Sequence, residues 1–373
     1  MANITIAGDL APIGRNIPAF QSGPPRSLAD LGLSPRDSLV IANLECPLAD
    51  AGDAIVKGGP ALRAPASAAK GIRSLGVSAV NLANNHIMDY GPAGLDQTIA
   101  SLSSAGVRCF GAGRTSMDAA LPAALEWGDA KLQVFGFAET EYNASTQRTA
   151  GASLLEISSL VRTLQRASKD SFVVALFHAG NEYFEYPSPW LRDTCRLAIE
   201  LGAGVVVCQH SHCIGSYEVY NGGLIVYGQG NFIFDMKTSK PGWWLGLMVQ
   251  LQIAGNTLRG FQFTPFRQTP GVNLVEPLEP APGHQVLDAF EQRSALLADE
   301  DKFLAAWDQF CEANRRNYQS HLFGLGRITR RVNRLLGFCD LIPRKGQRNI
   351  GNALRCQSHL EALRQLYSRE KTC

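Results

Sequence analysis

The stretch "VVVCQHSHCIG", residues 205–215, joins a short apolar run directly to two histidines that are separated by one serine. The β-branched run predicts a strand that is buried on both faces, as in sheets covered by helices. In open α/β sheets, functional side chains gather just beyond the carboxyl ends of the strands. We therefore expect His210 and His212 at the mouth of a buried strand, on the same side of an extended chain.

Outward from this stretch, the first 270 residues alternate strand-like and helix-like segments. Short β-branched runs occupy residues 3–8, 38–45, 77–84, 132–138, 171–180, 204–212 and 223–232. Helical patterns lie between them, at 66–76, 94–106 and 189–202. This rhythm predicts an α/β domain. Two strand-like runs around Gly255-Asn256 predict a β-hairpin over 243–266, so the sheets should be mixed.

The predicted strands end in one chemical type of side chain: Asp9, Asn43 to Glu45, Asn84 to His86, His178, and the pair His210 and His212. Four of the seven histidines of the chain therefore stand at strand ends. Carboxylates, amide oxygens and imidazoles are ligands for Zn²⁺, Mn²⁺ and Fe²⁺. The pattern predicts a site for one or two such divalent ions.

Single residues of this set also have ordinary structural explanations. Asn85 suits a turn after a strand, Glu45 suits a helix terminus, and Asp9 suits a helix N-cap. A lone histidine at a strand end is commonly a hydrogen-bonded structural residue. The metal site is favoured because all of these residues occur together, each at the end of a different predicted strand.

The same motifs, in the same order, resemble the CapA family of bacterial capsule or poly-γ-glutamate synthesis proteins, within the calcineurin-like metallophosphoesterase superfamily. They are "GD", "NLE", "NLANNHIMDYGPAGL", "GAG", "FHAGNEY" and "QHSHCIGSYEVYNGGLIVYGQGNFIFD", and they span about residues 3–267. The resemblance implies a four-layer α/β/β/α sandwich with a two-metal centre between its sheets.

The resemblance also implies a role for each strand-end residue. The first ion would be held by Asp9, Glu45 and His212. The second ion would be held by Glu45, Asn85, His178 and His210. His86 would stay unligated and act as general acid or base, which suits a side chain that titrates near neutrality.

Three positions depart from the phosphoesterase pattern. Ala11 stands where that pattern has a histidine ligand, Glu45 replaces a shorter aspartate, and Gln209 replaces a glycine. The first two departures are shared with CapA-like proteins and favour that branch. The missing ligand at Ala11 predicts one tightly and one loosely held ion.

Further residues are candidates for the pocket around the ions. Arg63 and Glu182 are the preferred substrate-binding residues, and Lys57, Tyr183, Asn231 and Asp235 are weaker candidates. A cation such as Arg63 would meet an anionic polymer or peptide substrate.

We expect three regions: a catalytic domain over 1–270, a proline-rich linker over 271–283, and a basic helical region over 284–373. Residues 315–373 carry 13 Lys/Arg against 3 Asp/Glu, whereas residues 1–314 carry 22 against 30. A helix over 327–338 would place four arginines on one side, where they could be solvated or contact an anionic membrane surface or polymer. Nucleic acid is disfavoured, because no recognition motif accompanies the charge.

Three functions are compatible with these features. The first is a metal-dependent hydrolase of an amide, ester or phosphoester bond in capsule, poly-γ-glutamate or peptide metabolism. The second is an isomerase or peptide epimerase that uses the same site, with Asp9 and His86 moving protons. The third is a non-catalytic accessory subunit of capsule synthesis. We expect a cytoplasmic protein, because no signal peptide or membrane span is recognised and the nine cysteines form no C-x-x-C pair.

Overall fold

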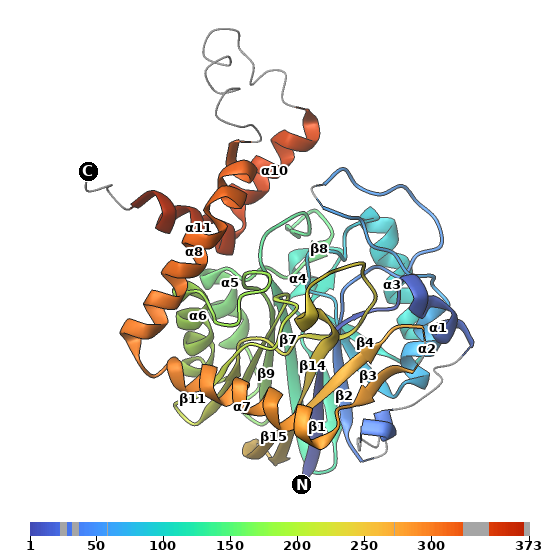
Figure 1. Cartoon of the computed structure of the whole chain (residues 1–373). Helices are drawn as coiled ribbons and strands as arrows, with labels where there is room; N and C mark the ends of the chain where they lie inside the picture. The colour runs from blue at the N-terminus through green and yellow to red at the C-terminus, as the bar shows by residue number, and fades with distance from the viewer. Residues whose placement is uncertain (23–27, 32–36, 58, 272, 324–342, 369–373) are drawn as a thin grey trace, which may run out of the picture.

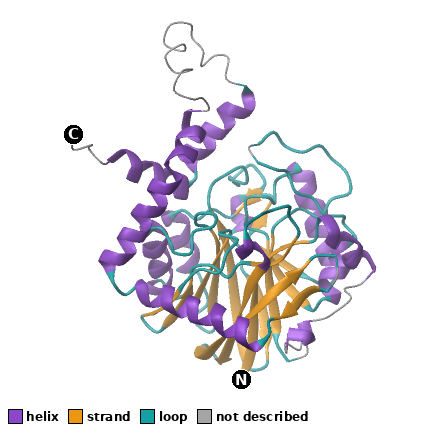
Figure 2. Cartoon of the chain, viewed as in Figure 1, coloured by secondary structure: helices purple, strands orange, loops and turns teal. Residues whose placement is uncertain are grey.

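Two β-sheets face each other at the centre of the molecule, with helices outside them (Figures 1 and 2). The structure is a computed structural model that describes residues 1–22, 28–31, 37–57, 59–271, 273–323 and 343–368. Among them, no helix is both long enough and apolar enough to span a membrane.

The first sheet is mixed and has the strand order β16-β15-β14-β1-β2-β3-β4, with β13 paired to β1. Its parallel strands are β1 (Ala2–Ala11), β2 (Leu39–Leu44), β3 (Val77–Asn81), β4 (Arg108–Phe110) and β13 (Asn231–Phe234). Its antiparallel strands are β14 (Leu245–Ala254), β15 (Thr257–Thr269) and β16 (Leu274–Pro277). The predicted hairpin around Gly255-Asn256 is confirmed, since it joins β14 to β15.

The second sheet has the order β11-β12-β10-β9-β7-β6. Its strands are β6 (Ala123–Trp127), β7 (Ala130–Ala138), β9 (Phe172–His178), β10 (Val205–Gln209), β11 (Tyr217–Tyr220) and β12 (Gly223–Val226). The short strands β5 (Ala112–Gly113) and β8 (Gly151–Ala152) form a separate pair. The central strands β7, β9, β10 and β12 are parallel, so their carboxyl ends lie at one edge.

Three layers of apolar side chains hold these sheets and helices together. Between the sheets, Ile6 of β1 packs in one core with Val174 of β9 and Val207 of β10. Outside the first sheet lie α1 (Ile17–Ser22), α2 (Ala68–Ser74) and α3 (Gly91–Ser104). Outside the second lie α5 (Ile157–Leu164) and α6 (Pro189–Glu200), and the short α4 (Ser116–Ala119) lies beside β5. The predicted four-layer sandwich is confirmed.

The run 223–232, predicted as one strand, is two strands in different sheets. β12 belongs to the second sheet and β13 to the first, and the chain crosses between them at Gly228 and Gly230, both with positive φ. A Cβ at Gly230 would approach the backbone oxygen of Leu245, so the crossing requires glycine there. The crossing places residue 231 beside the ends of both sheets.

Residues 271–283 differ from the predicted linker. β16 pairs with β15, and α7 (Pro280–Leu296) then starts at once. The prolines stand at a strand end and in the first helical turn, where a missing N–H costs little. Phe290 of α7 is buried in the core between the sheets. Composition alone cannot distinguish prolines at these positions from prolines in a linker.

After α7, the described residues form α8 (Glu300–Phe323), α10 (Arg344–Arg355) and α11 (Gln357–Ser368). The predicted helical appendage is therefore confirmed in these ranges. The helix predicted over 327–338 lies outside the described residues.

Candidate metal centre

The strand-end residues predicted from the sequence meet at one edge of the sandwich. Asp9 and Glu45 come from the first sheet, at and just beyond the ends of β1 and β2. His178 ends β9 in the second sheet, and His210 and His212 follow its neighbour β10. Because the two sheets face each other, carboxylates from one sheet meet imidazoles from the other.

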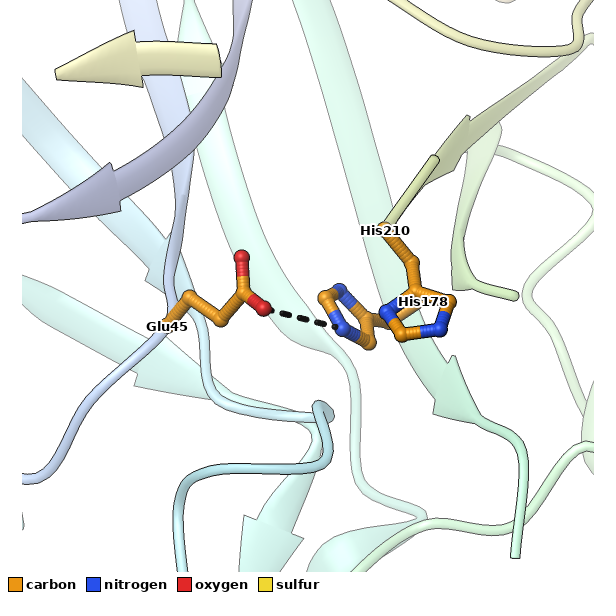
Figure 3. A group of neighbouring side chains, drawn as sticks. All are labelled: Glu45, His178 and His210. Carbon is orange, nitrogen blue, oxygen red and sulfur yellow. Dashed lines mark ion pairs between the residues drawn. The ribbon is translucent and has the colours of Figure 1, made fainter. Parts of the chain in front are cut away.

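Two groups of candidate ligand atoms form there, and within each group all atoms lie within 4.8 Å of one another. The first group is Asp9, Glu45 and His212, and the second is Glu45, His178 and His210. Glu45 belongs to both, as expected of a bridging ligand. Figure 3 shows its carboxylate pointing at His178, with Oε1 3.5 Å from Nε2, and His210 lying beside them.

Unpaired buried atoms show that these residues fit a metal ion. Both carboxylate oxygens of Glu45 and Nδ1 of His210 are buried without a hydrogen-bond partner among the described residues. Leaving such atoms unsatisfied costs about 1–3 kcal/mol each. The Oδ1 of Asn85, 3.1 Å from His178 Nε2, adds an oxygen donor to the second group. Buried imidazole, carboxylate and amide donors of this kind suit Zn²⁺, Mn²⁺ or Fe²⁺.

The electrostatics of the cluster favour a cation. Burial, and then the charge of Asp9, hold the pKa of Glu45 well above its usual range. Burial lowers the pKa of His178, and lowers that of His210 to about 4, which leaves neutral imidazoles suited to coordination. For His212, burial works against protonation, but the Glu45 and Asp9 charges raise its pKa to about 10. The two carboxylates therefore attract positive charge.

The backbone around the paired histidines is not extended, in contrast to the expectation from the sequence. β10 ends at Gln209, and His210 (φ 95°) and His212 (φ 53°) both have positive φ. Such φ values are costly for residues with a Cβ and cluster at functional sites. The turn is held by the N–H of His210, which donates to Asp9 Oδ2 (3.2 Å). The imidazoles converge through this strained turn rather than through strand alternation.

Two buried asparagines orient the candidate ligands from behind. Asn43 Nδ2 donates to Asp9 Oδ1 (2.8 Å) and lies 3.1 Å from His178 Nδ1. Asn231 Oδ1 lies 2.8 Å from His212 Nδ1, and its Nδ2 donates to the backbone of Trp243. Such outer contacts fix the ring orientation of ligating histidines. Asn231 was among the pocket candidates predicted from the sequence, whereas Asn43 was named with the strand-end residues but was given no role of its own.

His86 lies in a second, adjoining group of polar residues. Its Nδ1 is 2.7 Å from Asp89 Oδ2, and Lys57 Nζ donates to Asp89 Oδ1 (2.6 Å). Burial lowers the pKa of His86. Lys57, a weak candidate for substrate binding, is buried against Asp89, so its ammonium supports His86 instead.

The remaining sequence candidates lie around this edge at different depths. Glu182 is exposed, and its charge adds to the causes that raise the pKa of Glu45. Arg63 is exposed, with its guanidinium 4.5 Å from the ring centre of Tyr90. Asp235 accepts hydrogen bonds from Arg15. The substrate-binding roles of Arg63 and Glu182 stay predictions.

Sequence reasoning missed two acids beyond the end of β7. Glu141 Oε1 lies 3.9 Å from His210 Nε2. Glu139 is buried, and this burial raises its pKa to about 7. The strand-end rule applied to β7 would have found both, because they follow its last residue, Ala138.

The chain is similar, at low sequence identity, to curated proteins that are named for capsule, PGA or polyglutamine synthesis. The chain is 29% identical over 203 residues to the PGA biosynthesis protein CapA of Bacillus subtilis, covering 52% of each chain. It is 29% identical over 181 residues to the capsule biosynthesis protein CapA of Bacillus anthracis, covering 47% of this chain and 44% of that protein. A probable polyglutamine synthesis accessory protein of Mycobacterium tuberculosis is 27% identical over 170 residues, or 42% of this chain and 45% of that protein. The chain thus spans about half the length of the curated relatives it matches.

Solved structures also resemble the chain at low sequence identity. A hypothetical protein from Thermus thermophilus has a TM-score of 0.45 at 16% identity and covers 72% of this chain and all of its own. The 5'-nucleotidase from Candida albicans has a TM-score of 0.42 at 10% identity, covering 78% of this chain and 57% of its own. The family model of the bacterial capsule synthesis protein PGA_cap matches residues 3–236, well over half of the chain. The chain therefore belongs to the PGA_cap family of bacterial capsule synthesis proteins.

Proposed function

We propose that this protein is a metal-dependent hydrolase that acts on an amide, ester or phosphoester bond in capsule, poly-γ-glutamate or peptide metabolism. The observation that carries the proposal is the Glu45 carboxylate. It is fully buried and has no hydrogen-bond partner among the described residues, and its Oε1 lies 3.5 Å from His178 Nε2 and 3.8 Å from His212 Nε2. Burying such a carboxylate costs stability unless a cation or a proton compensates its charge.

In this proposal, Asp9, Glu45 and His212 hold one ion, and Glu45, Asn85, His178 and His210 hold the other. Bound ions of this kind activate a water nucleophile and stabilise negative charge on the reacting group. The ligands are fixed in advance by their hydrogen bonds to Asn43 and Asn231.

His86 supplies the proton chemistry. Its Nδ1 is held by Asp89, which leaves Nε2 to accept a proton from water or deliver one to the leaving group. Asp9 takes part as a ligand: Asn43 and the backbone of His210 donate to its two oxygens, which fixes the carboxylate in place. The family, and the capsule and PGA names of the relatives, support a substrate from an acidic polymer or peptide pathway.

Metal content tests the proposal most directly. We expect about one to two equivalents of Mn, Zn or Fe in protein purified without a histidine tag. The double variant His210→Ala, His212→Ala removes one imidazole from each group and should lose the metal. Elemental analysis measures both, and His284→Ala, at an exposed histidine of α7, is the matched control. If wild-type protein dialysed against Mn²⁺ and Zn²⁺ held no metal, an accessory role in capsule synthesis would replace the hydrolase.

One observation favours a second candidate, a metal-dependent epimerase. Ala11 is buried at the end of β1 and offers only a methyl group, so it would add no ligand to Asp9, Glu45 and His212, and a substrate carbonyl would bind the ion in its place. His86 would then move a proton at the carbon beside that carbonyl. Incubation in D₂O separates the candidates, because deuterium incorporation without cleavage supports the epimerase and cleavage without incorporation supports the hydrolase.

A further inference from the structure

The C-terminal helices lie at the same end of the molecule as the metal centre. Figure 1 shows α8, α10 and α11 together at the end away from the N-terminus. β1 starts at the N-terminus and runs toward that end, where it delivers Asp9. These helices lie outside residues 3–236, the part of the chain matched by the family model.

An aromatic cluster fastens the helices to the loop that follows His178. Phe184 of this loop stacks on Phe310 of α8, with ring centres 4.3 Å apart, and also contacts Trp307. Ala362 and Leu363 of α11 are buried in the same cluster. The C-terminal helices therefore pack against the loop that follows His178 through this apolar cluster.

The residues where α10 meets α11 donate hydrogen bonds to Glu139, the first acid after β7. Cys356 Sγ donates to Glu139 Oε2 (3.1 Å), and Ser358 Oγ donates to Glu139 Oε1. Two residues further, Glu141 faces His210.

Helix α10 contacts the other loops of this edge. Arg348 Nη1 donates to the backbone oxygen of Val56 (2.5 Å), one residue before Lys57. Asn349 Oδ1 accepts from the hydroxyl of Tyr142, whose ring centre is 5.7 Å from Lys57 Nζ. Lys57 in turn supports Asp89 and His86. Arg348 thus stands at the rim of the loop that carries Lys57.

The charge of Arg348 is available for a ligand. Its side chain is exposed, and in the described part of the chain it donates to a neutral carbonyl, that of Val56. A guanidinium has five N–H donors in a fork that matches a carboxylate, so most of them remain for a bound acid. Lys57, by contrast, is already paired with Asp89.

We propose that Arg348 binds a carboxylate of the substrate beside the reacting bond, so that the C-terminal helices form one wall of the substrate site. This inference rests on the proposed function and extends it to substrate recognition. It assigns selectivity to a region outside the family match, while the metal ligands come from within that match.

Binding of a defined probe tests the assignment. The probes are tri-γ-glutamate and its fully amidated counterpart, measured by isothermal titration calorimetry on the full chain with metal. Arg348→Ala should weaken binding of the acid about tenfold, the loss of one partly exposed charge-assisted contact, and leave the amide unaffected. Arg348→Lys should recover part of the loss. Arg355→Ala is the matched control, because Arg355 is exposed on the same helix and donates back to Gly351.

Equal binding of the acid by wild type and Arg348→Ala, or no binding of the acid by wild type at millimolar concentration, would overturn the inference. An equal loss in Arg348→Ala and Arg355→Ala would overturn it too, since only the overall charge of the helix would then matter. If binding depends on Arg348 but no metal-dependent cleavage occurs, the result counts against the hydrolase alone. If metal-dependent cleavage occurs but binding does not depend on Arg348, the result counts against the role of Arg348 alone.

Discussion

Asn43 shows how a single buried side chain organises the candidate centre. Its Nδ2 faces Asp9 and His178, which come from different sheets, and its Oδ1 accepts from the amides of Asn81 and Asn84. Every one of these contacts is fully buried. One amide therefore couples ligands of both candidate ions to the end of β3.

Replacing Asn43 tests this coupling. We expect Asn43→Ala to lower metal affinity about 10–100-fold, the usual effect of losing an outer-shell partner. Competition against a chelating indicator measures the affinity, and Asn256→Ala in the exposed β14–β15 turn serves as control. Unchanged affinity in Asn43→Ala would show that the ligands are oriented without it.

At this scale the sequence predicted which candidate ligands come together better than it predicted the residues that support them. Asp9, Glu45, His178, His210 and His212 were predicted as strand-end residues, and the two groups contain all five. The supporting roles were not predicted, because these side chains contact residues far away in the sequence. Lys57 contacts Asp89, and Asn43 contacts His178. A spacing pattern within one segment cannot reveal such pairs.

Among the elements, β3 and β7 form a close contact between the two sheets. Gly136 of β7 lies against Asn81 of β3, and a Cβ there would overlap Asn81 Oδ1. Asn81 cannot move aside freely, because its amide bonds Asn43 and both backbone groups of Ala83. A glycine is therefore required at this contact.

We expect Gly136→Ala to destabilise the fold by roughly 1–3 kcal/mol, the range for overpacking a close contact. Thermal unfolding measures the change. Gly242→Ala is the control, since a Cβ at Gly242 meets no atom within 4 Å. Equal stability of the two variants would mean that the sheets adjust without strain.

Element boundaries were less predictable than element types. The β-branched runs predicted the central strands correctly, because burial on both faces leaves a clear apolar signal. The crossing at Gly228 and Gly230 was missed, since the apolar pattern continues through it while the chain changes sheet. Pairing partners of this kind are long-range contacts that no local pattern encodes.

For the whole molecule, Glu139 joins the sandwich to the C-terminal helices. Its carboxylate accepts from Cys356 and Ser358, about 220 residues later in the chain. Burial raises its pKa from 4.5 to about 7. The folded protein therefore keeps a proton at near-neutral pH that the unfolded chain releases.

The proton held by Glu139 makes the free energy of unfolding depend on pH in a defined direction. As pH rises from about 4.5 to 7, unfolding releases the proton and becomes more favourable, by up to about 3 kcal/mol. Glu139→Gln removes the ionisation, so chelator-treated wild type should lose stability over this window relative to the variant. Denaturant unfolding at a series of pH values measures it. Parallel curves for the two proteins would show that Glu139 ionises normally in the folded state.

The division of ligands between the two sheets also sets the order of events during synthesis. Asp9 and Glu45 leave the ribosome early, whereas His178, His210 and His212 follow more than 130 residues behind Glu45. In both groups, the carboxylates come from the first sheet and the imidazoles come from the second sheet. A nascent chain thus has no complete set of donors until the second sheet has docked on the first. Any ion bound there would be acquired only after His212 has left the ribosome, and it would then link the two sheets of the sandwich.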